Sequence, residues 1–127
     1  MFIRYFMILM MLGGSGAVWS HDFTPTYPKL EQSYIEGVLK ASMKLFNKRK
    51  DVRYYEVSVY DNEWNKIPFA MLGEKVMNLE YLETKYFDVF IQEKSRNKAT
   101  YICTKTKLLV TDKTNAMLDS RICSKIK

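Results

Sequence analysis

The sequence predicts an α+β fold in which one long N-terminal helix lies across an antiparallel β-sheet of about four to five strands. Two observations lead to this class. Apolar residues within residues 30–50 recur at intervals that fit one broad face of a helix. The segments after residue 52 are rich in β-branched and aromatic residues, and several alternate as strands do. One helix followed only by strands is the element order of an α+β domain.

The helix is predicted over residues 30–50. Its apolar face comprises Tyr34, Ile35, Val38, Leu39, Leu45 and Phe46. Glu36 and Lys40 form an i,i+4 pair in the favourable order. Asn47 and the basic run at residues 48–50 suit a helix C-terminus, where cations meet the negative end of the helix dipole. Gly37 inside the helix costs about 1 kcal/mol relative to alanine.

Strands are predicted over residues 52–60, 75–86, 87–91, 99–110 and 116–123. In the first of them Tyr55, Val57 and Val59 share a face, and in the fourth Tyr101, Cys103 and Lys105 share one. Residues 67–73 are interpreted as a hairpin connection because they contain Pro68 and Gly73, and proline and glycine commonly mark turns. Residues 92–98 and 112–115 are predicted turns, and residues 21–29 a flexible extended arm.

Residues 1–20 have the layout of a secretory signal peptide. Arg4 precedes an apolar run over residues 5–12, and small residues follow. The run is too short for a membrane span, although an uncleaved N-terminal anchor is the alternative. Cleavage would leave one domain, residues 21–127, that is secreted and extracellular with a net charge of +5 in place of +6.

The residues that remain exclude several kinds of chemistry. His21, the one histidine of the chain, would become the mobile N-terminal residue of the mature protein. The folded part would then lack a histidine for acid–base or Cys–His catalysis. The Gly-Gly-Ser-Gly run leaves with the signal peptide. We therefore expect no enzyme, no catalytic residue, no cofactor and no metal site.

Cys103 and Cys123 are the two cysteines of the chain. Because a secreted protein meets an oxidising environment, a disulfide between them is predicted, with two free thiols as the alternative. In the chain-entropy estimate a loop of this length stabilises the fold by about 3 kcal/mol.

Three features together resemble the type-2 cystatins, secreted inhibitors of papain-like cysteine proteases. The predicted helix ends in an aromatic residue and an asparagine, Phe46 and Asn47. The distance from Asn47 to Gly73 is close to the family's spacing between that asparagine and the glycine of its first inhibitory hairpin. The twenty-position interval between Cys103 and Cys123 equals that of the family's C-terminal disulfide. The resemblance implies a cystatin-like fold.

The resemblance also places the inhibitory residues. The first hairpin, Gln-x-Val-x-Gly in the family, corresponds to Phe69, Ala70, Met71, Leu72 and Gly73, which keep only the glycine. The second hairpin, which carries Pro-Trp in the family, corresponds to Thr111 and Asp112. The family's other disulfide is missing. For Phe69, Met71 and Leu72, packing in the core or against a sheet edge is the alternative interpretation.

Three functions follow as expectations. The first is inhibition of papain-like cysteine proteases, such as cathepsins, by a hairpin wedge whose activity is weakened or lost. The second is a cystatin-fold secreted binding or interaction protein that no longer inhibits. The third is a cationic host-defence protein that acts on anionic surfaces. No nucleic-acid-binding motif and no later membrane span is found in the sequence, and we expect a monomer.

Overall fold

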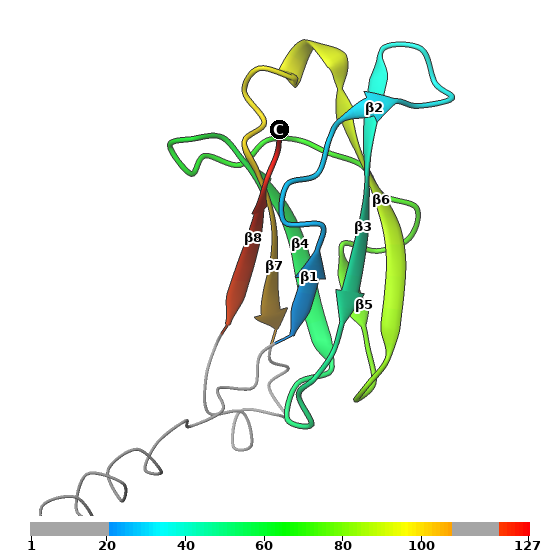
Figure 1. The fold of residues 1–127 in the computed structure, drawn as a ribbon, viewed down its shortest axis with the longest axis vertical. Helices are drawn as coiled ribbons and strands as arrows, with labels where there is room; N and C mark the ends of the chain where they lie inside the picture. The colour runs from blue at the N-terminus through cyan, green and yellow to red at the C-terminus, as the bar shows by residue number, and fades with distance from the viewer. Residues whose placement is uncertain (1–20, 108–119) are drawn as a thin grey trace, which may run out of the picture.

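Two antiparallel sheets make up the computed structural model of this chain, which describes residues 21–107 and 120–127 (Figure 1). In sheet A, β3 (Val38–Phe46) pairs on one side with β6 (Thr84–Gln92). On its other side it pairs with two short strands, β1 (Asp22–Thr24) and β2 (Glu31–Gln32). Sheet B has the order β5 (Val76–Asn78), β4 (Tyr54–Tyr60), β7 (Tyr101–Lys107) and β8 (Arg121–Lys125). A short 3-10 turn, η1 (Glu93–Ser95), follows β6.

The predicted α+β class with a cystatin-like fold is wrong, because the described residues contain no α-helix and form a β-sandwich. The predicted helix over residues 30–50 is β2, a turn and β3. The reason is that apolar residues along this segment also recur at every second position, which is the spacing of a strand and not of a helix. Residues buried against sheet B alternate along β3 with outward-facing ones; the buried set is Leu39, Ala41, Met43 and Leu45. Such strict alternation is the pattern of a strand with one buried face. Gly37 lies in the turn before β3 with a φ of 78°.

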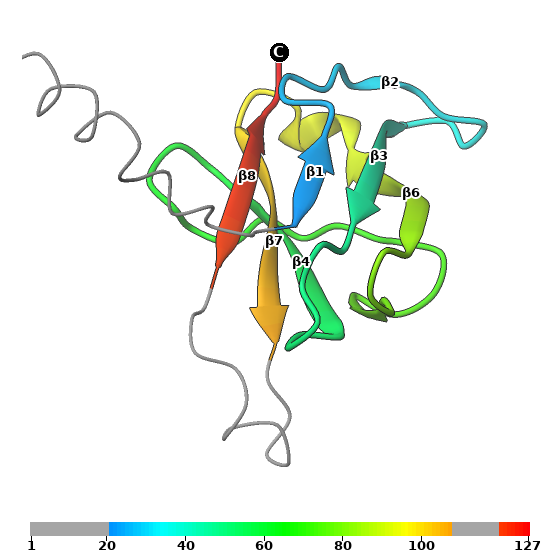
Figure 2. The same cartoon turned by 60° about the horizontal axis from the view of Figure 1, so that its bottom comes forward.

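The core lies between the two sheets and is built from their inward-facing residues. From β4 these are Tyr55, Val57 and Val59, which the sequence had correctly placed on one face. Sheet A contributes the buried residues of β3 together with Val89 and Ile91 of β6. The connections from β3 to β4, from β5 to β6 and from β6 to β7 each cross between the sheets (Figure 2). Antiparallel β-sandwiches carry many unrelated functions, so the fold alone assigns none.

The other predicted strands agree with the structure to within a few residues, with two exceptions. The predicted strands at residues 52–60 and 99–110 correspond to β4 and β7, and residues 87–91 lie within β6. The predicted strand at residues 75–86 divides into β5, a turn and the beginning of β6. The last strand, expected at residues 116–123, is β8, displaced toward the C-terminus. Residues 1–20, with the predicted signal peptide, lie outside the described residues.

The N-terminal arm was predicted to be flexible, and this prediction is wrong. Phe23 of β1 is buried, and β1 pairs with the end of β3. Residues 26–28 then leave sheet A and run beside β8, where the N–H groups of Lys125 and Lys127 donate to the carbonyls of Thr26 and Pro28. Figures 1 and 2 both show β1 between β3 and β8. The arm therefore closes one lateral edge of the sandwich.

A second crossing segment, residues 67–75, closes the opposite edge. It leaves the end of β4, crosses to sheet A and returns as β5 (Figure 1). Ile67 is buried and bonds to β4, whereas Ala70 and Phe90 of β6 exchange two backbone hydrogen bonds of 2.9 Å. These residues therefore join β4 to its antiparallel neighbour β5, as the predicted hairpin connection implies, but through a long loop that also pairs with β6 of the other sheet.

Candidate functional site: an aromatic and arginine cluster on sheet B

The outer face of sheet B carries the most distinctive group of side chains in the described part of the chain. In β7, Ile102, Thr104 and Thr106 point into the core, so Tyr101 and Lys105 point outward. The register of sheet B then brings together side chains from β4, β7, β8 and the loop after β4. We call Tyr60, Trp64, Tyr101 and Arg121 the aromatic platform.

The loop after β4 is fixed by Asp61. Its carboxylate accepts hydrogen bonds of 2.9 Å from the backbone N–H groups of Glu63 and Asn65, and one of 3.2 Å from the Asn65 amide. The hydrogen bonds from Asn65 and Glu63 hold the pKa of Asp61 below its ordinary value. Trp64 adopts a left-handed backbone conformation, with a φ of 65°. A side chain that accepts bonds from its own loop is the usual means of ordering such a turn.

The ring of Trp64 lies flat on that of Tyr101. Their centroids are 4.4 Å apart, and their planes differ by 4°. Tyr60 approaches Trp64 at 5.8 Å in a tilted arrangement. Arg121 Cζ lies 4.9 Å from the Trp64 centroid and 5.8 Å from that of Tyr60, which places the guanidinium over both rings. Trp64 nevertheless remains 46% exposed, so the platform presents a large aromatic surface to solvent.

The predicted disulfide between Cys103 and Cys123 is confirmed, and it lies beside the platform. The two cysteines are direct partners across β7 and β8. Further along the same two strands, the Thr106 N–H donates to the Ser120 carbonyl, so Thr106 and Ser120 are a hydrogen-bonded pair. Because hydrogen-bonded and non-hydrogen-bonded pairs alternate in antiparallel strands, Cys103 and Cys123 are a pair that exchanges no backbone hydrogen bonds. The covalent link fixes the two strands that carry Tyr101 and Arg121 relative to each other.

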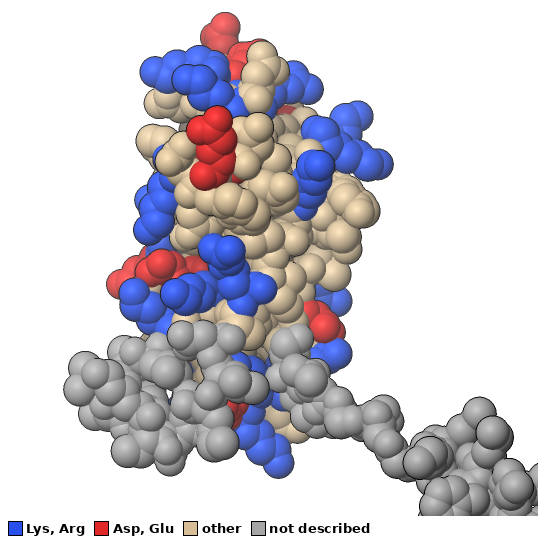
Figure 3. Space-filling model, turned by 90° about the vertical axis from the view of Figure 1, so that its left-hand side faces the viewer, with Lys and Arg blue, Asp and Glu red and all other residues tan. Residues whose placement is uncertain are grey.

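The charges on this face are mostly positive. The outward-facing charged residues of β4, β7 and β8 are Glu56, Lys105, Lys107, Arg121 and Lys125. Glu56 is bonded to Lys107 Nζ at 3.2 Å. Figure 3 shows basic side chains spread over the side of the molecule formed by β8 and the loop after β4, around a broad uncharged area. The platform is therefore an aromatic surface with a cationic border.

The residues predicted as a first inhibitory hairpin have divided roles. Phe69 and Met71 are half-buried and pack against the core. Lys75 Nζ lies 4.4 Å from the Phe69 ring centroid. Leu72 is 79% exposed, and Gly73 beside it has a φ of 92°. Thr111 and Asp112, the predicted second hairpin, lie outside the described residues.

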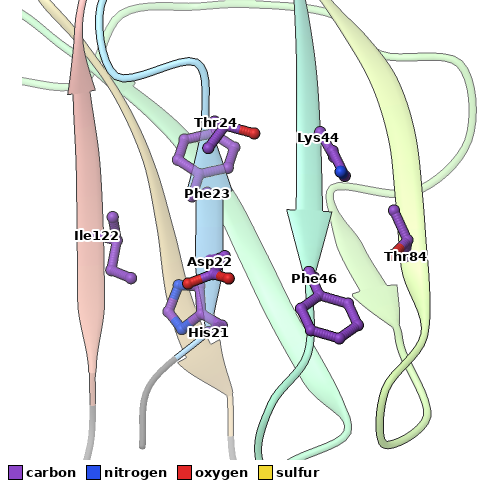
Figure 4. A pocket seen from close by; sticks show the side chains of 8 residues that line it. All are labelled: His21, Asp22, Phe23, Thr24, Lys44, Phe46, Thr84 and Ile122. Atoms are coloured by element: carbon purple, nitrogen blue, oxygen red, sulfur yellow. The ribbon is translucent and has the colours of Figure 1, made fainter.

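A surface hollow surrounds the start of β1, and His21 is one of the residues that line it (Figure 4). The expectation of a mobile terminal histidine is wrong, because His21 is fully buried. Its Nε2 is 2.8 Å from Thr104 Oγ1, and its ring centroid is 4.6 Å from that of Tyr55. Burial lowers the pKa of His21 to about 4. A neutral, enclosed imidazole of this kind is a structural group and a weak base at neutral pH.

Sequence reasoning did not single out Trp64 or Arg121. Tyr60 and Tyr101 lie within the strands predicted over residues 52–60 and 99–110, but neither of them was assigned to a site from the sequence. One local signal was available, because the sequence Asp61-Asn62-Glu63-Trp64-Asn65 begins with a residue that commonly orders a turn. The approach of Arg121, 57 positions from Trp64, depends on strand register and has no local signal.

Comparisons with known proteins assign no function to these features. No protein-family model matches the chain, and no curated protein sequence matches it. Among residues 21–107 and 120–127, no group of three or more His, Cys, Asp or Glu side chains is arranged to hold a metal ion. In the same residues, no helix is long and apolar enough to cross a membrane.

Proposed function

We propose that this protein is a secreted, non-enzymatic interaction module that binds a protein partner through the aromatic platform. The observation that carries the proposal is the half-exposed Trp64, stacked on Tyr101 and covered on one side by Arg121. Tryptophan, tyrosine and arginine are the residues that most often dominate the binding energy of protein interfaces.

The rigidity of the platform supports the same function. Binding usually loses free energy when interface side chains become ordered. Here Trp64 is already held by its stacking on Tyr101 and by a loop that Asp61 orders. The disulfide fixes the strands beneath it. A partner would therefore meet a surface that needs little further ordering.

The disulfide also supports the extracellular location. Disulfides persist in oxidising compartments and are rare in the cytosol. Cys103 and Cys123 are bonded, and the first twenty residues have the layout of a signal peptide. The signal peptide and secretion remain predictions, which N-terminal sequencing of the protein recovered from culture medium would test.

Inhibition of papain-like proteases stays a prediction, and one observation favours it. Leu72 is exposed beside Gly73, whose positive φ allows a turn that other residues adopt with difficulty. However, the N-terminal arm pairs with β8 at one edge of the sandwich, whereas Ala70 pairs with β6 at the other. A wedge that uses both segments would need them at the same end. Titration against papain and a cathepsin, with Leu72→Asp as the comparison, would decide the matter.

The test of the interaction module uses the protein as bait on a panel of purified extracellular domains. Each binding partner is then measured against Trp64→Ala and against Tyr86→Ala. Tyr86 is the matched control because it is an aromatic residue, 76% exposed, on the outer face of sheet A. We expect Trp64→Ala to weaken binding about 30-fold or more, as loss of about 2 kcal/mol at a hot spot would do.

The control should retain wild-type affinity. Circular dichroism and thermal unfolding of each variant would show that the fold is intact. Partners that bind Trp64→Ala as well as wild type, or a panel with no binder at all, would contradict the proposal.

A further inference from the structure

Two cations face each other at the border of the platform, one of them Arg121 of the platform itself. Lys105 of β7 and Arg121 of β8 are cross-strand partners, two positions along from the disulfide-bonded pair. Like the cysteines, they occupy positions that exchange no backbone hydrogen bonds, where side chains on antiparallel strands approach most closely. Like charges at directly opposed positions destabilise a sheet. The fold itself therefore gains nothing from this pairing.

The described part of the chain does not neutralise the pair. Glu56 faces Lys105 from β4, but its carboxylate is bonded to Lys107. Neither Lys105 nor Arg121 forms an ion pair with a carboxylate among the described residues. The Arg121 guanidinium instead lies over the rings of Trp64 and Tyr60. The two charges are thus left available to a bound anion.

The guanidinium of Arg121 suits one kind of anion. Arg121 Cζ lies 4.9 Å from the Trp64 ring centroid, and a guanidinium that contacts an aromatic ring still carries N–H donors along its planar edge. Such an edge matches the two oxygens of a carboxylate, which it binds with paired hydrogen bonds. Lys105 opposite adds a point charge on the same side of the sheet. The arrangement therefore forms a site for a planar anion at the border of an aromatic surface.

We propose that Lys105 and Arg121 together bind the carboxylate of an acidic side chain on the partner that covers the platform. This inference rests on the proposed function and adds the chemistry of the partner. A protein is favoured over a sulfated polysaccharide because the cationic positions do not form a continuous track. Glu56 interrupts them on one side, and aromatic rings border them on another.

The experiment measures binding of an octaglutamate peptide to the isotope-labelled protein by NMR, with octaglutamine as the uncharged probe. A heparin tetrasaccharide is titrated separately. The variants are the double substitution Lys105→Gln/Arg121→Gln and the single substitution Arg121→Lys. The matched control is Lys40→Gln/Lys44→Gln, which removes the same charge from two outward positions of β3 on the other sheet.

We expect octaglutamate to cause saturable shifts at Lys105, Arg121 and the Trp64 indole, and octaglutamine to cause none. The double variant should weaken binding at least about tenfold, and Arg121→Lys should weaken it less because it keeps the charge. The control variant should bind within about twofold of wild type, since exposed charges beyond the screening length interact weakly.

A second measurement does not depend on binding. Removing one of two opposed like charges should raise the melting temperature, so Lys105→Gln should be more stable than wild type, and more so at low salt. Equal loss of octaglutamate binding in the control variant, or shifts only with the heparin fragment, would overturn the inference. A partner whose binding is weakened by Trp64→Ala but unchanged by Lys105→Gln/Arg121→Gln would also overturn the inference. That result would leave the proposed function intact.

Discussion

The hydroxyl of Tyr55 donates a 2.5 Å hydrogen bond to Oδ1 of Asn47, and both side chains are fully buried. Burial raises the pKa of Tyr55 to about 12, so the hydroxyl stays protonated and can donate. The same Oδ1 accepts the Arg49 backbone N–H at 2.9 Å. Asn47 Nδ2 donates to the carbonyls of Val52 and Leu79 at 2.8 and 3.0 Å. One amide thus joins the segments that follow β3 and β5 to the segment before β4.

Replacing Asn47 should therefore be one of the most damaging single changes in the protein. Asn47→Ala leaves several buried backbone groups and the Tyr55 hydroxyl without this partner, and should lower the free energy of unfolding by about 3 kcal/mol or more. Tyr55→Phe removes one bond and should lower it by about 1–2 kcal/mol. Urea denaturation of the two variants gives both values. Equal losses would show that the amide does not act as a common anchor.

His21 should make the stability of the protein depend on pH. Its pKa is about 4 in the folded state, chiefly because of burial, and its ordinary value is 6.5. The folded state therefore disfavours the protonated imidazole. The stability that the neutral imidazole gives the folded state is fully present above pH 6.5. It is lost as the pH falls from 6.5 toward 4, and the free energy of unfolding decreases by up to about 3 kcal/mol.

The effect is measured as the difference in free energy of unfolding between wild type and His21→Gln at each pH from 7.5 to 4.5, in steps of about half a unit. Carboxylates that titrate in the same range act on both proteins and cancel in this difference. We expect the wild type to lose stability relative to the variant as the pH falls. A difference that stays constant across the range would contradict the assignment.

The disulfide should contribute a large share of the stability. Cys103 and Cys123 are separated by 20 positions in the sequence, and closing a loop of this size stabilises a fold by about 3 kcal/mol in the chain-entropy estimate. The double substitution Cys103→Ala/Cys123→Ala should lose about that amount in urea denaturation. Dithiothreitol should destabilise the wild type similarly and leave the double variant unchanged. A reductant effect on the variant would point to another cause.

The sequence predicted β4 and β7 of sheet B because their alternation is local. Val57 and Val59 differ from their neighbours in polarity, and each such contrast lies within a few residues. In β3 the same contrast was present, but the apolar residues at positions 34, 35, 38 and 39 also fit a helical face. Pairing of β3 with β6 along nine residues determines the outcome, and this contact joins positions 38 to 54 residues apart.

The candidate site was less predictable than the strands, for the same physical reason. The stacking of Trp64 on Tyr101 and the approach of Arg121 arise only when β4, β7 and β8 lie in register. The disulfide was the exception, since a chain with two cysteines has one possible internal pairing. The cystatin resemblance was based on spacings that a different fold also satisfies.

The course of residues 26–28 beside β8 has a mechanical consequence. The two hydrogen bonds there join Lys125 to Thr26 and Lys127 to Pro28, so both chain segments run in the same direction. A force that pulls residue 21 and residue 127 apart would draw these segments past each other along their length. The two hydrogen bonds are perpendicular to this force, so both would have to break at the same time. Hydrogen bonds that are parallel to a pulling force break one after another. The sandwich is thus built to resist stretching along the axis of its strands.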